Sequence, residues 1–163
     1  MQTSYMSAEV KRETLGVAIR LMLSADVATV AKILGEAPEA ANWSRESLEE
    51  LRNSPGGLAL VSEVDGELSG FLVGRQVVDE AEILNLGVAR GRRRRGDGRA
   101  LLKAAMDEWL LRGVSRVFLE ARESNEAGIA SYTRHGFAKR GRRPAYYRDP
   151  VEAAVIMEKK LGD

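Results

Sequence analysis

Three apolar stretches in the middle of the chain follow one another so closely that their relative direction is fixed. Leu58 to Val64 and Leu68 to Val78 are separated only by Asp65-Gly66, and Ala81 to Val88 follows directly after Asp79-Glu80. Asp-Gly is favoured in tight hairpin turns because both residues tolerate positive φ. Strands joined by such short turns run antiparallel. The sequence therefore predicts an antiparallel three-stranded unit.

Other elements are predicted on both sides of this unit. Upstream, the sequence favours a strand over Thr14–Leu23, a helix that Asp26 caps and Pro38 ends, and a second helix capped by Ser44. Downstream, a helix with one apolar face ends near Gly113, and an α/β unit follows. The apolar face of that helix comprises Leu101, Leu102, Ala105, Met106, Trp109 and Leu110. The later elements are a strand Arg116–Ala121, a helix Glu126–Arg134, a short strand Phe137–Arg140 and a final strand Ala153–Lys159.

Length and composition limit the organisation of the chain. With 163 residues, 44% of them hydrophobic, the chain fits one domain with its own core. Residues 1–11 carry no periodicity and are expected to form a flexible tail, which leaves residues 12–163 as a single domain. The chain has no cysteine, so we expect neither a disulfide framework nor a thiolate metal site, and the single histidine lacks partners for another kind of metal site. No apolar run approaches the roughly 20 residues of a membrane span, and no signal-peptide pattern is present, so a cytoplasmic location and no membrane partner are expected.

Positive charge is concentrated in one loop. The formal net charge is only +1, which argues against a general nucleic-acid binder, yet six arginines fall between Arg90 and Arg99. Gly96 and Gly98 stand in this segment between a strand end and a helix start, where glycines allow close backbone approach and a helix N-terminus attracts anions. A pyrophosphate cradle and a solvated surface turn both fit these residues. The loop matches neither a Walker loop nor the dinucleotide-binding pattern G-x-G-x-x-G.

Two motifs at the right separation resemble the GNAT acetyltransferase superfamily. Arg93-x-x-Gly96-x-Gly98 is similar to the family's (Gln/Arg)-x-x-Gly-x-(Gly/Ala) motif, placed after the fourth predicted strand. The downstream motif has its anchors at Asn125, Tyr132 and Gly136-Phe137, although Gly128 replaces the usual alanine. The resemblance implies an α/β fold with a mixed, mostly antiparallel central sheet, flanked by helices and splayed between the fourth and fifth strands. It also implies acetyl-CoA as cosubstrate.

A finer resemblance is to the RimI-type enzymes, which acetylate the N-terminal alanine of a small-subunit ribosomal protein. It is carried by Leu119-Glu120-Ala121-Arg122-Glu123-Ser124-Asn125, Arg142-Arg143-x-x-Tyr146-Tyr147 and the terminal Ala154-Val155-Ile156-Met157. The family's Pro-Trp-Ser is Asn42-Trp43-Ser44 here, which leaves the enzyme class intact but bears on which protein is acetylated.

Glu120 and Tyr132 are the candidate catalytic residues. Glu120 alternates with Val117, Leu119 and Ala121, which should point into the core, and it stands at the carboxyl end of its strand. The resemblance gives Glu120 the role of general base and Tyr132 that of general acid. From the residues alone, the sequence favours a surface carboxylate paired with Arg116 or Arg122 for Glu120, and a half-buried packing residue of the helix for Tyr132.

The cofactor-binding residues follow from the same resemblance. Asn125 either binds the coenzyme or caps a helix, or does both. His135, the single histidine, either flanks the site three residues after Tyr132 or simply ends the helix, and Tyr146 and Tyr147 are placed in a loop beside the peptide groove. The predicted cofactor-binding residues are Leu86, Gly87, Val88, Arg93, Arg94, Arg95, Gly96, Asp97, Gly98, Arg99 and Asn125.

The sequence thus favours direct acetyl transfer from acetyl-CoA to the N-terminal α-amino group of a protein or peptide, with a ribosomal protein as the expected partner and no direct binding of nucleic acid. One alternative is a GNAT enzyme acting on a small amine, an antibiotic or a lysine side chain. Another is a non-catalytic module that binds coenzyme A or RNA through the arginines.

Overall fold

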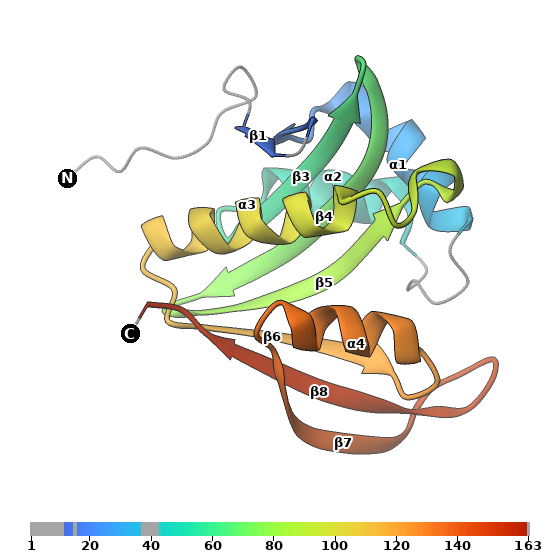
Figure 1. The fold of residues 1–163 in the computed structure, drawn as a ribbon, viewed down its shortest axis with the longest axis vertical. Coiled ribbons are helices and arrows are strands. Elements are labelled where there is room, and N and C mark those ends of the chain that lie inside the picture. The colour runs from blue at the N-terminus through green and yellow to red at the C-terminus, as the bar shows by residue number, and fades with distance from the viewer. Residues whose placement is uncertain (1–11, 15, 37–42, 163) are drawn as a thin grey trace.

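A computed structural model describes residues 12–14, 16–36 and 43–162 of the chain. The predicted tail at residues 1–11 and the predicted helix end at Pro38 lie outside the described residues. Figure 1 shows a twisted central sheet with helices on both of its faces.

The described strands form one eight-stranded sheet in the order β1-β2-β3-β4-β5-β6-β8-β7. Neighbouring strands are antiparallel except for β5 and β6, which run parallel. The strands are β1 Arg12–Thr14, β2 Val17–Leu21, β3 Gly57–Val64, β4 Glu67–Val77, β5 Glu80–Val88, β6 Arg116–Arg122, β7 Ala138–Tyr147 and β8 Glu152–Lys160. The mixed, mostly antiparallel α/β sheet predicted from the sequence is confirmed.

Helices cover the two faces of the sheet unequally. In Figure 1, α3 and α4 lie on one face, and α1 and α2 lie behind the half of the sheet that contains β3 and β4. The helices are α1 Val27–Gly35, α2 Arg45–Asn53, α3 Asp97–Leu111 and α4 Glu126–Arg134, with short 3₁₀ turns η1 Ser24–Asp26 and η2 Arg90–Arg92. The helices expected over 126–134 and after Ser44 are confirmed, and the Ser44 hydroxyl accepts a hydrogen bond from the Ser47 N–H at 3.0 Å.

Strand alternation divides the apolar side chains between two cores. Leu60 and Leu72 face α3, where Trp109 is fully buried, while Val61, Phe71 and Val73 face α1 and α2. This is the period of two expected for a sheet that is covered on both faces. The larger core continues across β5 and β6 to β8, so it holds together the two halves of the sheet on either side of the parallel pair.

One predicted turn is confirmed, and one turn that was not predicted interrupts a predicted strand. Asp65 and Gly66 have φ of 53° and 80°, the two positive values of a tight hairpin turn. The single strand predicted over Thr14–Leu23 is wrong, because Gly16 with φ of 78° lies in a turn and Thr14 pairs with Val17 across it. A glycine in that position reverses the chain where the apolar composition suggested continuity.

The strand β7 is much longer than the predicted Phe137–Arg140. It reaches Tyr147, which pairs with Glu152 of β8, so the placement of Tyr146 and Tyr147 in a loop is wrong. Almost every residue of β7 is exposed, and β7 lies at the edge of the sheet. Its side chains therefore show no apolar alternation, and its pairing with β8 defines it instead.

Asp26 does not cap α1 as predicted. It has helical backbone angles, and its carboxylate accepts hydrogen bonds from Arg20 Nη1 at 2.7 Å and from the Leu23 N–H at 2.7 Å. Burial raises the pKa of Asp26, but the hydrogen bonds from Arg20 and Leu23 outweigh it and lower that pKa overall. Asp26 thus ties β2 to the turn before α1.

We expect Asp26→Asn to lower the free energy of unfolding by about 2 kcal/mol at pH 7, the scale of hydrogen bonds to a charged group. Because the folded pKa of Asp26 lies below its unfolded value of about 3.9, its contribution is present above that pH and is lost as the pH falls through the folded pKa. Urea unfolding at pH 7 and pH 3 measures the difference. Asp107→Asn in the exposed Lys103 pair is the control, and an equal loss at both pH values for Asp26→Asn would contradict the expectation.

Candidate active site

The two parallel strands pair over only part of their length. Glu80–Ile83 of β5 pairs in register with Arg116–Leu119 of β6. Beyond these residues Asn85–Val88 stays with β4, while Glu120–Arg122 stays with β8. The sheet therefore opens at the carboxyl ends of β5 and β6. These are the fourth and fifth strands of the prediction, because β1 and β2 replace one predicted strand, so the predicted splay is confirmed. Open α/β sheets bind ligands at such carboxyl ends.

A small cavity of about 90 Å³, which we call the splay cavity, occupies this opening. Glu120 of β6 and Tyr132 of α4 both line it, so the two predicted catalytic side chains share one space. Glu120 is half-buried, and its Oε2 atom is buried without a hydrogen bond from any described residue. Because such an oxygen is costly to leave without a donor, the site is suited to a substrate N–H group.

Glu120 also lines a second opening, the outer groove, of about 280 Å³. Val117, Leu119 and Ala121 are buried in the α3 core, so Glu120 belongs to the opposite face of β6. The carboxylates of the outer groove outnumber its guanidinium groups. Its charged residues are Glu80, Glu82, Glu120, Arg75 and Arg143. Glu120 lines both the outer groove and the splay cavity. Its carboxylate can therefore contact a positively charged substrate group that enters through the outer groove.

Tyr132 lies in the interior of the site as a neutral phenol. Its ring packs edge-on against Phe137, with ring centroids 5.8 Å apart. Burial, followed by the nearby Tyr147 phenol, raises the pKa of Tyr132 to about 12. The hydroxyl consequently keeps its proton at neutral pH, which is the state a proton donor needs.

Two further tyrosines surround the Glu120 carboxylate. Tyr147 lines the splay cavity, and burial first and the charge of Glu120 second raise its pKa to about 12. The charge of Glu120 is the largest cause that raises the pKa of Tyr146, followed by burial and a hydrogen bond to Glu120. Arg122 stacks on the Tyr147 ring, with Cζ 4.5 Å from the centroid, and holds the backbone oxygen of Arg148 at 3.0 Å. The end of β7 is thereby fixed against the site.

Asn125 caps α4, as one of its two predicted roles requires. Its Oδ1 accepts a hydrogen bond from the Gly128 N–H at 3.0 Å. A Cβ at residue 128 would lie 2.4 Å from the Asn125 Nδ2, so the glycine found there makes room for this side chain. Asn125 also lines the splay cavity, and its contact with a coenzyme stays a prediction.

The predicted contact segment Leu86–Val88 spans the two candidate binding spaces. Leu86 lines the splay cavity, and its N–H donates to the Asn85 Oδ1 at 3.0 Å. Val88 lines a larger cavity at the end of β5. Gly87 lies against Phe71, where a Cβ would come within 2.6 Å of the ring, so its small size serves the core.

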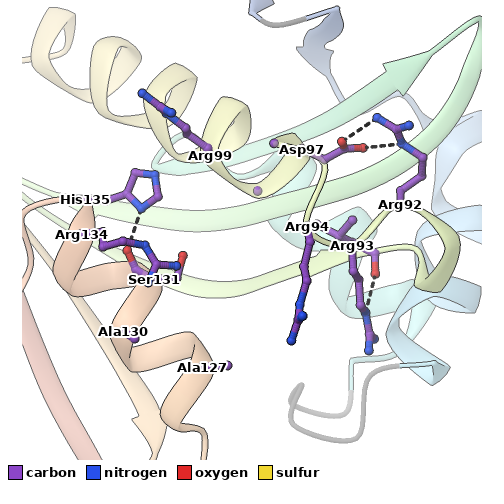
Figure 2. Close-up of a pocket in the computed structure, with 13 residues that line it drawn as sticks. Arg92, Arg93, Arg94, Asp97, Arg99, Ala127, Ala130, Ser131, Arg134 and His135 are labelled. Atoms are coloured by element: carbon purple, nitrogen blue, oxygen red, sulfur yellow. Dashed lines mark hydrogen bonds and ion pairs between the residues drawn. The ribbon is translucent and has the colours of Figure 1, made fainter.

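That larger cavity, which we call the arginine cavity, has a volume of about 830 Å³ and lies between the start of α3 and one face of α4 (Figure 2). The predicted loop residues Arg93, Arg94, Gly96, Asp97, Gly98 and Arg99 all line it. The predicted Arg95 is exposed and is absent from its lining. On β5, Leu86 lines the splay cavity and Val88 lines the arginine cavity, so the two spaces lie two residues apart along this strand.

Asp97 has a structural task that the sequence did not indicate. Its fully buried carboxylate binds Arg92 through two hydrogen bonds, from Nη2 at 2.9 Å and from Nε at 3.3 Å (Figure 2). This pair connects η2 to the first turn of α3. The carboxylate is thus neutralised by a neighbour, which leaves the backbone N–H of residue 97 as the group that faces an anion.

The start of α3 fits a diphosphate group. Gly96 precedes the helix with φ of 92°, a left-handed conformation that favours glycine. The first N–H groups of α3 have no intrahelical partner, and Gly98 leaves open space, since a Cβ there would have Val88 as its nearest neighbour at 3.9 Å. Arg93 and Arg94 of the preceding loop line the same cavity. Backbone donors, open space and positive charge therefore coincide.

Residues 27–137 match the family model described as the acetyltransferase (GNAT) family. The chain belongs to the GNAT acetyltransferase family. The matched segment begins at α1 and ends just after α4, so it contains the splay and the arginine cavity. In the described part of this GNAT chain, no helix has the length and apolarity that a membrane crossing requires.

Several named relatives are N-acetyltransferases of proteins. The chain is 41% identical over 95 residues to the [ribosomal protein bS18]-alanine N-acetyltransferase of Escherichia coli K12. The aligned residues make up 57% of this chain and 64% of that protein. It is 30% identical over 167 residues to the N-alpha-acetyltransferase RimI of Mycobacterium tuberculosis, covering 97% and 99% of the two chains. A crystal structure of the ribosomal-protein-S18-alanine N-acetyltransferase from Escherichia coli superposes with a TM-score of 0.82 at 32% identity, covering 90% of this chain and 95% of that one.

One wall of the GNAT site was not predicted from the sequence, apart from the alternative that His135 flanks the site. The arginine cavity is closed by one face of α4, which adds Ala127, Ala130, Ser131, Arg134 and His135. These residues recur at i, i+3, i+4, i+7 and i+8, the spacing of one helical face. The mixture of small and cationic side chains on that face was the available signal.

Proposed function

We propose that this chain transfers the acetyl group of acetyl-CoA to the N-terminal α-amino group of a protein, a small-subunit ribosomal protein in the cytoplasm. The observation that carries the proposal is the unsatisfied Oε2 of Glu120, which lies between the splay cavity and an outer groove with an excess of carboxylates. Family membership supports the acyl donor, and the names of the relatives support the acceptor. The proposed acetyltransferase domain covers residues 12–163.

Acetyl-CoA supplies an activated acyl group as a thioester. The start of α3 would hold its diphosphate, and Asn125 and the open edge of β5 would hold the arm that leads into the splay cavity. An α-amino group has a pKa of about 8, so most of it is protonated and unreactive at neutral pH. The Glu120 carboxylate accepts one proton from the ammonium, and the neutral nitrogen bonds to the acyl carbon as the carbon–sulfur bond breaks. Tyr132 gives its proton to the departing thiolate, and the second proton of the new amide nitrogen restores the Tyr132 hydroxyl.

The test compares acceptors with the purified chain. A peptide with a free N-terminal alanine, the same peptide with a blocked N-terminus and one internal lysine, spermidine and an aminoglycoside are each incubated with acetyl-CoA, and the products are measured by mass spectrometry. We expect acetylation only of the free N-terminus. Turnover of a polyamine, an aminoglycoside or lysine with no reaction at the N-terminus would overturn the proposed acceptor. Failure of acetyl-CoA to bind in calorimetry would overturn the proposed reaction.

A further inference from the structure

The arginine cavity has two cationic regions. Arg93 and Arg94 belong to the loop before α3, whereas Arg99, Arg134 and His135 gather on the other side of the cavity, where α4 meets the first turn of α3 (Figure 2). We call the latter group the far-wall triad. Its members come from two elements that only the fold brings together.

The arginines of the far-wall triad are not used to hold the fold together. Among the described residues, neither Arg99 nor Arg134 forms an ion pair, and both side chains are exposed. By contrast, Arg92 binds Asp97 and Arg142 binds Glu123. Arg99 also stands in the first turn of α3, where the helix dipole disfavours a cation. An unpaired cation held in an unfavourable position indicates an anion that arrives from outside.

The His135 ring has a fixed orientation beside these arginines. Its Nδ1 lies 2.7 Å from the Ser131 backbone oxygen, and because a carbonyl only accepts, Nδ1 carries the proton of that hydrogen bond. Nε2 is therefore the nitrogen left to meet a ligand in the cavity, and it donates a hydrogen bond to a phosphate oxygen when the ring carries both protons. The His135 backbone oxygen accepts from Lys159 Nζ at 2.7 Å, which anchors the residue from β8 and adds a further positive charge nearby.

The arginine cavity is large enough to hold a second anionic group beside the far-wall triad. A volume of about 830 Å³ lies in the range of roughly 300–1,000 Å³ that is typical of sites for whole small molecules. A diphosphate held at the start of α3 would occupy only part of it. Coenzyme A carries one more phosphate, a monoester on its ribose, and that group also needs a site.

We propose that the far-wall triad of Arg99, Arg134 and His135 binds the ribose phosphate monoester of coenzyme A and selects the phosphorylated coenzyme over its dephosphorylated form. The inference rests on the proposed use of acetyl-CoA. The loop arginines and the first turn of α3 serve the diphosphate, which the two forms share. The far-wall triad serves the group that distinguishes them.

The test measures, by calorimetry, the dissociation constants of acetyl-CoA and acetyl-dephospho-CoA for the purified chain. We expect acetyl-CoA to bind about tenfold more tightly, since the exposed charge contacts of Arg99 and Arg134 each contribute a few-fold. Raising the salt concentration should reduce that ratio, because the contacts are exposed. Equal and tight binding of both coenzymes would overturn this inference alone, whereas binding of neither would overturn the proposed function together with it.

Paired substitutions assign the effect to the far-wall triad. Arg99→Gln combined with Arg134→Gln should bring the ratio of the two dissociation constants close to one, because any contact of these side chains with the shared diphosphate affects both coenzymes alike. The matched control is Arg90→Gln combined with Arg95→Gln, which removes the same charge from exposed arginines outside the cavity lining and should leave the ratio at about ten. A ratio that survives in the Arg99 and Arg134 variant, or that is lost equally in the control, would contradict the assignment.

Discussion

Replacing Glu120 by Gln should lower kcat by about 10²–10⁴ at pH 7, the range that a positioned general base contributes. Gln has nearly the same shape but cannot take a proton from the substrate ammonium. The Oε2 atom has no hydrogen bond from a described residue, and Gln keeps an oxygen that can accept from Tyr146, so folding and acetyl-CoA binding should be kept. Steady-state kinetics with an N-terminal alanine peptide, together with calorimetry for acetyl-CoA, measures both effects.

The pH dependence makes this expectation specific. As the pH rises from 7 to 9, the peptide amine with a pKa of about 8 loses its proton to water. The defect of Glu120→Gln should therefore shrink by up to about tenfold. Glu123→Gln is the matched control, because Glu123 lies three residues away in an exposed pair with Arg142, and it should stay within about twofold of the unmodified chain. A Glu120→Gln variant with unchanged kcat would remove the base from the mechanism.

Glu120 could be located from the sequence because the strand that carries it has a clear pattern. Val117, Leu119 and Ala121 are buried as the alternation predicts, which places Glu120 on the other face near the strand end. The same alternation could not reveal that β6 separates from β5 after Leu119, since that separation depends on which neighbour each strand keeps. The splay came from the family resemblance instead.

The parts of the site that the sequence missed depend on contacts between distant segments. Tyr147 reaches the splay cavity because β7 pairs with β8 up to Glu152 and because Arg122 holds its ring. Neither contact leaves a periodic signal in an exposed edge strand. The Arg92–Asp97 pair likewise needs the turn η2 to bring the two side chains together, and a run of arginines gives no indication of which one is paired.

Tyr132→Phe should lower kcat by about 10²–10⁴ while leaving the fold and acetyl-CoA binding in place. Phe keeps the ring that packs against Phe137, so the substitution removes only the hydroxyl. The departing alkyl thiolate has a reference pKa of about 8.5, and burial in the same cavity raises it in the same direction as the pKa of Tyr132. The pKa of a buried thiol therefore lies closer to the pKa of Tyr132 than the pKa of a solvent-exposed thiol would.

The two catalytic substitutions should differ in their response to pH. Because the pKa of Tyr132 is about 12, its hydroxyl is fully protonated from pH 6.5 to 9, and the ratio of kcat between the unmodified chain and Tyr132→Phe should stay constant over that range. The defect of Glu120→Gln should shrink over the same range. If Tyr132→Phe kept kcat within threefold, Tyr132 would serve packing alone. Tyr147, a neutral phenol in the same cavity with a pKa of about 12, would then be the proton donor to test by Tyr147→Phe.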